Sequence, residues 1–310
     1  MDKGRFIGAV KHTKLLSAIA AALISLLSLP LVRSVFKIIF KRFIGPARLP
    51  IKYALYCPAI GKIDLSLPGG ERFTMYGDGK DPVANSLYWL GVDRGYEYET
   101  IKIWADLAKR ADVIFDIGAY SGVFSLAAAA VNHGARIFAF EPADVTYEYL
   151  SRNVSMNGCN NITAIKKAVS DKDGAVTLTV PFSPLLPFAA TTTDTVRRKD
   201  IKRAVTVDSV CVDSFVKDNG IGKVDLVKID VEGAEPGVLE GMRATIKMHR
   251  PKFIIEVLPG EKTQDFLPGF FKPYGYAWYL LTDEGPVKKD VIKGDPMYIY
   301  LNWLFVKEAL

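Results

Sequence analysis

The segment VDLVKIDVEGAEPGVLEGM, residues 224–242, decides the fold of this 310-residue chain. It begins as an apolar strand of the buried type, VDLVKID, and continues into a helical pattern that runs from about Pro236 to Lys247. The same alternation starts at residue 112, and its further strands read RIFAFEP (136–142), ITAIKKAVS (162–170) and KFIIEVL (252–258). Strands that alternate with helices at this spacing predict an α/β fold with a parallel, doubly wound sheet.

The pattern changes at both ends of this region. After residue 260, two closing strands are expected at 278–281 and 297–306 without a full helix between them, so at least one must run antiparallel to its neighbour. Ahead of the sheet, a Gly-rich hairpin and two helices predict a small cap. We therefore expect three parts: a basic helical segment over 1–50, the cap over 51–110 and the main domain over 111–310.

Charged residues crowd the end of the strand within 224–230. Lys228 lies among apolar residues in the strand interior, where an unpaired ammonium is rarely found, so it needs a carboxylate partner. The acids that follow it are Asp230, Glu232 and Glu235. Glu235 also fits the first turn of the next helix, where an acid is favourable. Because open parallel sheets bind ligands at the carboxyl ends of their strands, this edge is a candidate site.

A second motif, DIGAYSG (116–122), stands where a strand turns into a helix. Its glycines let the backbone approach a ligand, and Glu141 at the end of the next strand can accept hydrogen bonds from ribose hydroxyls. The frame lacks the GxGxxG of nicotinamide dinucleotide sites. The carboxylate of Asp116 would repel a pyrophosphate and attract a sulfonium or an ammonium. The motif favours a cationic, adenosine-containing ligand, and a tight turn without a ligand is the alternative.

Together these motifs resemble the FkbM-type family of S-adenosylmethionine-dependent methyltransferases. The resemblance covers about 95–257 and rests on GYE (95–97), DIGAYSG, AFEP (139–142), AVSDKDG (168–174), VDSFV (212–216), KIDVEGAE (228–235) and RPKFIIEV (250–257). It implies a class I methyltransferase fold, which is a Rossmann-like, doubly wound seven-stranded sheet with a reversed last strand. It also implies S-adenosyl-L-methionine as the cofactor.

The same resemblance implies a cofactor site. The methionine part would lie against the first motif, at Asp116, Gly118, Ala119, Tyr120 and Gly122. The ribose would lie against Glu141, while Ser170 and Asp171 are placed to approach the adenine. Glu97 would reach the methionyl ammonium, although it also fits as an ordinary acid at a helix start. Tyr120 stands where the family often has Asn.

A hydroxyl acceptor needs a general base, because a hydroxyl is a weak nucleophile. The candidates are Asp230, Glu232 and Glu256. We expect Asp230 near the transferring methyl group, with Glu232 or Glu256 as the base. Lys228 would be the cation that fixes these carboxylates. No metal is expected, since the histidines lie outside the motifs and the cysteines (Cys57, Cys159 and Cys211) are widely spaced.

The N-terminal segment carries the excess positive charge. Residues 1–50 hold nine Lys and Arg against Asp2, a net of +8, so the rest of a chain with net charge +6 carries −2 and offers no basic surface for nucleic acid. Residues 15–32 are apolar, and a basic amphipathic pattern follows to residue 44. We expect membrane association through 15–44 at the cytoplasmic face. The alternatives are a spanning signal-anchor, a cleaved signal peptide, and a helix packed on the domain of a cytoplasmic protein.

The expected function is O-methylation of a sugar or other hydroxyl in a small-molecule or glycan acceptor, such as a glycolipid. The cap and the Pro- and Thr-rich stretch 181–198 would shape the acceptor pocket. One alternative is a membrane-tethered scaffold that binds the cofactor without turnover. The presence of Lys228, Asp230 and Glu232 argues against it. Another is an NAD-dependent oxidoreductase, which the missing GxGxxG disfavours.

Overall fold

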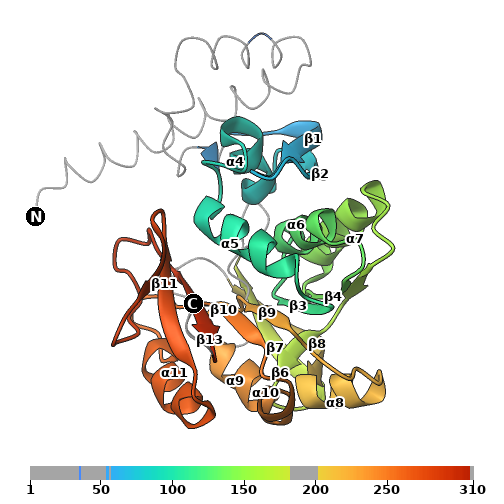
Figure 1. The fold of residues 1–310 in the computed structure, drawn as a ribbon. Helices are drawn as coiled ribbons and strands as arrows, with labels where there is room; N and C mark the ends of the chain where they lie inside the picture. Colours follow the sequence, from blue (N-terminus) through green and yellow to red (C-terminus); the bar gives the residue numbers. More distant parts are fainter. Residues whose placement is uncertain (1–34, 36–53, 56, 182–201, 308–310) are drawn as a thin grey trace, which may run out of the picture.

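Helices cover both faces of a central sheet, and a small cap sits at one end of the molecule (Figure 1). The computed structural model describes residues 35, 54, 55, 57–181 and 202–307. Within them the main sheet has eight strands in the order β12-β11-β13-β10-β9-β3-β4-β5. Their bounds are β3 (Val113–Ile117), β4 (Arg136–Phe140), β5 (Ile162–Ile165), β9 (Leu226–Ile229), β10 (Lys252–Glu256), β11 (Ala277–Thr282), β12 (Gly285–Lys288) and β13 (Asn302–Val306).

The strand directions confirm the predicted parallel sheet with a reversed last strand. β5, β4, β3, β9 and β10 run parallel, and β13 is antiparallel to both β10 and β11. The predicted number of strands was wrong by one, because β12 adds a hairpin strand to the edge at β11. The predicted strand 297–306 was too long at its start. Asp295 accepts hydrogen bonds from the N–H groups of Met297, Ile299 and Tyr300, so these groups do not join a ladder.

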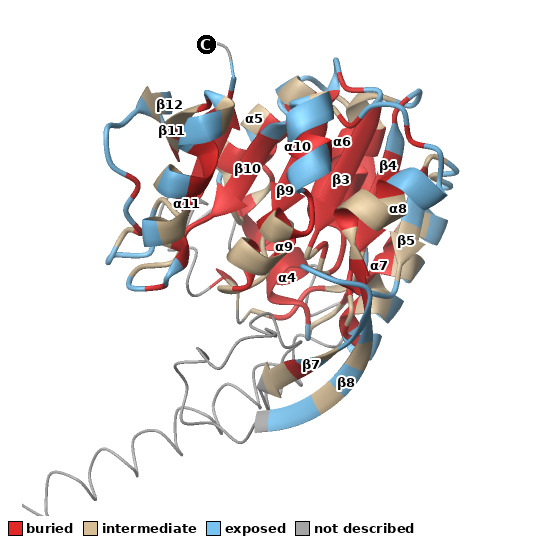
Figure 2. Cartoon of the chain, turned by 90° about the horizontal axis from the view of Figure 1, so that it is seen from below, coloured by how far each residue is buried: buried red, intermediate tan, exposed pale blue. Residues whose placement is uncertain are grey.

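Side chains of the central strands alternate between two apolar clusters, one on each face. In β3, Ile114 belongs to the first cluster and Phe115 to the second. The first cluster contains side chains of α4 (Pro82–Leu90), α5 (Tyr98–Ala108), α6 (Val123–Val131) and α7 (Asp144–Met156). The second contains those of α8 (Val212–Asp218), α9 (Glu235–Glu240), α10 (Arg243–His249) and α11 (Thr263–Phe271). Figure 2 shows strands β10, β9, β3 and β4 buried between these layers.

The cap begins with the predicted hairpin, β1 (Ile60–Ser66) and β2 (Arg72–Asp78), followed by α4 and α5. Asp81 caps α4 by accepting the N–H of Val83, and Pro82 occupies the first turn, where its missing N–H costs nothing. Apolar side chains of the hairpin and of both helices join the first cluster. This packing holds α5 against the sheet. The boundary between the cap and the main domain at residue 110 stays a prediction.

Two predicted elements are each split in the structure. The strand predicted over 162–170 becomes β5 and a separate β6 (Ala168–Ser170), which joins β8 (Lys202–Cys211) and β7 (Gly174–Pro181) in a three-stranded sheet. The helix predicted over 236–247 becomes α9 and α10. Gly241 follows the end of α9 and packs so closely on Ser170 that a Cβ would overlap the Ser170 carbonyl. Asp213 then accepts the N–H groups of Ala244 and Thr245 and so caps a new helix.

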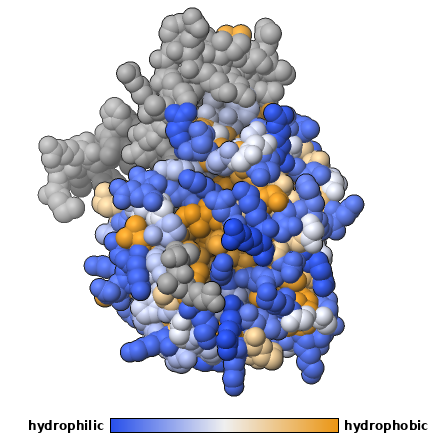
Figure 3. Space-filling model, in the orientation of Figure 1, coloured by the Kyte–Doolittle hydropathy of each residue, from blue (hydrophilic) through white to orange (hydrophobic). Residues whose placement is uncertain are grey.

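Several predictions lie outside the described residues. They are the membrane-associated helices within 15–44 and the part of the 181–198 loop after Pro181. Among the residues that are described, no helix is long and apolar enough to cross a membrane. The face in Figure 3 is mostly hydrophilic and has an apolar region near its middle. Membrane association therefore stays a prediction from the sequence.

Candidate active site

The polar side chains of the site share one face of the sheet. Asp116 of β3 is the register partner of Lys228 in β9, and Glu256 of β10 is the register partner of Asn302 in β13. Lys228 is itself the partner of Ile254, two residues before Glu256, so all four side chains face the same way. This is the face covered by α5 and α6, and the side chains stand at the carboxyl ends of the parallel strands.

Lys228 is buried and paired, as its position in the strand predicts. It is 1% exposed, its Nζ lies 2.6 Å from Oδ2 of Asp230, and it lies 4.3 Å from the centre of the Phe124 ring. Burial alone would lower the pKa of Lys228, but the surrounding carboxylates, Asp230 and Glu97 first, outweigh it and raise the pKa. The ammonium therefore stays charged and holds the Asp230 carboxylate in place.

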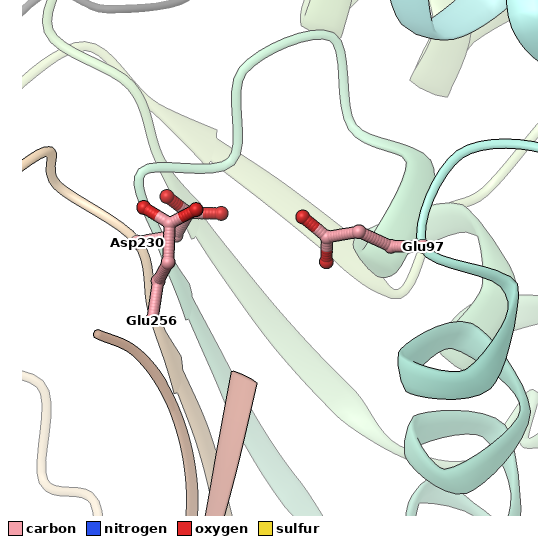
Figure 4. A group of neighbouring side chains, drawn as sticks. All are labelled: Glu97, Asp230 and Glu256. Carbon is pink, nitrogen blue, oxygen red and sulfur yellow. The ribbon is translucent and has the colours of Figure 1, made fainter. Parts of the chain in front are cut away.

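Glu97, Asp230 and Glu256 come together from three separate elements. One carboxylate oxygen of each lies within 4.8 Å of the other two. Figure 4 shows Asp230 and Glu256 side by side, with Glu97 pointing toward them from the start of α5. Burial raises the pKa of Glu256 well above its ordinary value, and the negative charge of Asp230 raises it further. Burial also raises the pKa of Glu97, although Lys228 opposes the shift.

The loop after β3 is built by close contacts within the protein. Gly118 has a φ of +82°, and a Cβ there would overlap the carbonyl oxygen of Asp230. Gly122, with a φ of +94°, packs in the same way against Leu150. The absence of a side chain at both glycines therefore also serves packing within the protein, and their contact with the cofactor stays a prediction. Tyr120 has a φ of +53°, a left-handed backbone that Asn tolerates better than Tyr, which explains the Asn expected from the family pattern.

Glu141 holds this loop as well as offering a ligand contact. Its Oε2 accepts the N–H of Tyr120 at 3.0 Å, and its Oε1 accepts the N–H of Ala143 and the hydroxyl of Thr146. A carboxylate offers about four acceptor positions, so Oε2 keeps room for one hydroxyl hydrogen bond. Nearby, Asp116 is 1% exposed, and its Oδ1 has no partner among the described residues. An acceptor buried in this way fits a donor group such as an ammonium.

The remaining predicted residues occupy different places. Ser170 and Asp171 stand at the end of β6, beside Gly241 at the end of α9, and their assignment to the adenine stays a prediction. Ala119 donates its N–H to the carbonyl of Phe140. Glu232 has a φ of +54° and lies in the turn after β9. Glu235 is buried and accepts hydrogen bonds from Thr263 Oγ1 and the N–H of Gly233, so it is a structural acid of the helix start and not a solvated one.

Asn302 is a site residue that the sequence analysis missed. Its Nδ2 donates to Oε2 of Glu97 at 2.9 Å, which joins β13 to the start of α5. The two residues are 205 positions apart in the chain, and a single Asn in a closing strand carries no motif that could have indicated this contact.

A model of the methyltransferase FkbM domain matches residues 116–277, which is more than half of the chain. The chain belongs to the FkbM methyltransferase family. S-adenosyl-L-methionine is the methyl donor of this family, and the unpartnered Asp116 oxygen and the open Glu141 position fit its ammonium and its ribose. The matched range includes Asp116, Glu141, Asp230 and Glu256 but not Glu97 or Asn302.

Three curated relatives illustrate the family. Methyltransferase sdnD of Sordaria araneosa is 35% identical over 156 residues, which cover 42% of this chain and 60% of that protein. Hexuronic acid methyltransferase AglP of Haloferax volcanii is 29% identical over 178 residues, with coverages of 57% and 69%. The 31-O-demethyl-FK506 methyltransferase FkbM of Streptomyces tacrolimicus is 29% identical over 203 residues, with coverages of 57% and 75%. The chain thus spans less than two thirds of the length of the Sordaria relative.

The raised pKa of Glu141 provides a test of its predicted contact with the ribose. Burial raises this pKa to about 7, against the opposing hydrogen bonds from Thr146, Ala143 and Tyr120. A ribose hydroxyl donates to the carboxylate form, which is lost as pH falls through 7. We expect the affinity for S-adenosylhomocysteine to fall about 10-fold between pH ~8 and pH ~5.5, as measured by calorimetry, since a charged acceptor adds roughly 1–1.5 kcal/mol to a hydrogen bond.

The Glu141→Gln variant is the matched control for this titration. It keeps the size of the side chain and one acceptor oxygen but cannot change charge. We expect it to bind more weakly than the wild type at pH ~8 and to show little pH dependence. The same pH dependence in both proteins would remove Glu141 from the ribose site.

Proposed function

We propose that the chain transfers a methyl group from S-adenosylmethionine to a hydroxyl of a sugar or a related acceptor. The observation that carries the proposal is the group of carboxylates around Lys228 at the ends of β9 and β10, beside the loop after β3. The printed names of two relatives support it, one as a hexuronic acid methyltransferase and the other as a 31-O-demethyl-FK506 methyltransferase. More specifically, we propose that the acceptor is a glycan or a glycolipid.

The chain's own residues supply binding, orientation and a proton acceptor. S-adenosylmethionine, when bound, supplies a methyl group made electrophilic by its sulfonium. Asp116 and Glu141 would hold its ammonium and its ribose, while the Asp230–Lys228 ion pair fixes the acidic edge of the site. Positioning of this kind can remove about 7–11 kcal/mol from a barrier. The hydroxyl proton of the acceptor passes to a carboxylate of the turn after β9 or of the end of β10.

The Asp230→Asn variant tests this arrangement. It keeps the shape of the side chain but removes the charge that pairs with Lys228 and faces Glu256. We expect turnover to fall about 10²-fold or more, because loss of this charge displaces Lys228 and the neighbouring carboxylates, while the affinity for S-adenosylhomocysteine changes little. The assay follows labelled methyl groups into extracted polysaccharide and glycolipid fractions, with affinity measured by calorimetry.

An exposed aspartate provides the control for this substitution. Asp106 lies on the surface of α5 and pairs with Lys109 at 3.0 Å, so Asp106→Asn should leave both turnover and binding unchanged. Full turnover in Asp230→Asn would remove this residue from the chemistry. Wild-type protein that binds S-adenosylhomocysteine but methylates no fraction would argue for a scaffold without turnover.

A further inference from the structure

The cluster of Glu97, Asp230 and Glu256 has the geometry of a cation site. One oxygen from each side chain lies within 4.8 Å of the others, so a single point can lie within about 2.8 Å of all three. Figure 4 shows the three carboxylates converging from α5, from the end of β9 and from the end of β10. Side-chain rotations that move each oxygen by a few tenths of an ångström would bring it to about 2.0–2.6 Å from that point. This is the range of distances at which Mg²⁺ and Ca²⁺ hold oxygen ligands.

Two buried oxygens at the cluster lack a hydrogen-bond donor within the part of the chain that the structure describes. Glu256 is 7% exposed, and its Oε2 has no partner. Asn302 is 3% exposed; its Nδ2 donates to Glu97, and its Oδ1 has no partner. A buried acceptor left without a donor costs about 1–3 kcal/mol. These oxygens therefore point to a ligand that brings positive charge to the cluster.

A bound cation would also favour the ionised forms of the three carboxyl groups. Lys228 contacts the cluster through Asp230 at 2.6 Å and is 1% exposed. With all three carboxyl groups ionised, one ammonium leaves the cluster with a charge of about −2, and burial raises the pKa values of Glu97 and Glu256 against that state. Neutral hydroxyl groups of an acceptor cannot stabilise that ionised state, whereas a divalent cation would do so with a single ion.

We propose that Glu97, Asp230 and Glu256 bind one divalent cation of the hard, oxygen-preferring class, such as Mg²⁺, Mn²⁺ or Ca²⁺. The three ligands are all carboxylates, which these ions prefer, and the cluster contains none of the imidazole or thiolate ligands that favour zinc or copper. The cation joins the start of α5 to the sheet, because Glu97 belongs to the cap side of the molecule. It replaces the expectation, drawn from His and Cys spacing, that the site needs no metal.

The role of this cation in catalysis rests on the proposed function. A cation at the cluster attracts the oxygen of an acceptor hydroxyl and makes its proton easier to lose. With Asp230 and Glu256 acting as ligands, the proton passes to the Glu232 carboxylate, and the electron pair of the O–H bond stays on the oxygen. Cation binding itself does not depend on this role.

Binding of Mn²⁺ alone tests the proposal, because the free ion has a sharp paramagnetic resonance spectrum that is lost on binding. Titration of the full-length protein should show one bound Mn²⁺ per chain. Glu256→Gln and Glu97→Gln keep the size of each side chain but remove a charged ligand. Each should weaken Mn²⁺ binding by about 10-fold or more. Glu148→Gln, the same change on the exposed surface of α7, should bind like the wild type.

Three results would overturn the cation site. They are equal Mn²⁺ affinity in the wild type and both site variants, no binding at about 1 mM Mn²⁺, and displacement of Mn²⁺ by S-adenosylhomocysteine. The last result would assign the cluster to the amino group of the methyl donor. Calorimetry with S-adenosylhomocysteine and the methyl-transfer assay are read separately. A protein that binds Mn²⁺ but transfers no methyl group would keep the cation site and lose the proposed function.

Discussion

Replacing Lys228 by methionine is expected to lower the free energy of unfolding by about 3–5 kcal/mol, because the change removes one partner of a buried ion pair. The side chain is 1% exposed, and its ammonium is the counter-charge of Asp230 at 2.6 Å. Methionine fills a similar volume against the Phe124 ring, so most of the loss comes from uncompensated carboxylates and little from a cavity. Urea unfolding at neutral pH measures the effect.

The surface pair between Lys223 and Asp225 is a matched control. Its N–O distance is also 2.6 Å, but the Lys223 side chain is 65% exposed. Lys223→Met should therefore cost only about 0–1 kcal/mol. If both variants lose the same stability, burial of Lys228 does not control the energetics of the site.

The stability deficit of Lys228→Met should also depend on pH. Lys228 lowers the pKa values of Glu97 and Glu256, against the larger effect of burial. Without it their folded-state pKa values rise further above the unfolded values. A group raised in this way contributes stability below its unfolded pKa and loses it as pH rises through its folded pKa. The loss of unfolding free energy should be larger at pH ~8 than at pH ~5. An equal loss at both pH values would show that the charge of Lys228 does not affect the pKa values of these carboxyl groups.

The sequence predicts the parts of the site that lie at the ends of adjacent strands. The apolar pattern and the spacing of the predicted strands place Asp116, Lys228 and Glu256 on strands of one parallel sheet. The carboxyl ends of such strands meet at one edge of the sheet. A charged residue inside an apolar strand also predicts a partner, and the structure supplies Asp230 for Lys228. These inferences are local, because each needs only the residues beside the motif and the rule for parallel sheets.

Contacts that depend on packing between distant segments could not be predicted. Glu97 joins the cluster because the cap seats α5 against the sheet, and Asn302 joins because the reversed strand β13 pairs with β10. β6 leaves the main sheet because it pairs with residues 209–211 of β8, which lie about forty positions later. The close packing of Gly241 on Ser170 after α9 likewise joins segments that are distant in the chain. The GYE motif indicates Glu97 as a site residue, but the sequence contains no signal for the pairings that bring these segments together.

Gly118→Ala is expected to have the second large effect, a loss of about 2–5 kcal/mol of folding free energy. Two costs combine at this position. An alanine at a φ of +82° costs about 1–2 kcal/mol, and its Cβ would overlap the carbonyl oxygen of Asp230, which belongs to the backbone and cannot rotate away. Relieving such an overlap costs about 1–3 kcal/mol more and separates the ends of β3 and β9.

Gly158 measures the first of these costs alone, so that its difference from Gly118 gives the second. It has a φ of +61°, and a Cβ there would have no neighbour within 4 Å, so Gly158→Ala should lose only the conformational 1–2 kcal/mol. Folded Gly118→Ala should also lose turnover by about 10²-fold, because a displacement of roughly 1 Å at Asp230 misaligns the reacting groups. Chemical unfolding and the methyl-transfer assay measure both effects. Equal losses in the two variants would show that the tight contact between the loop after β3 and Asp230 does not hold the site together.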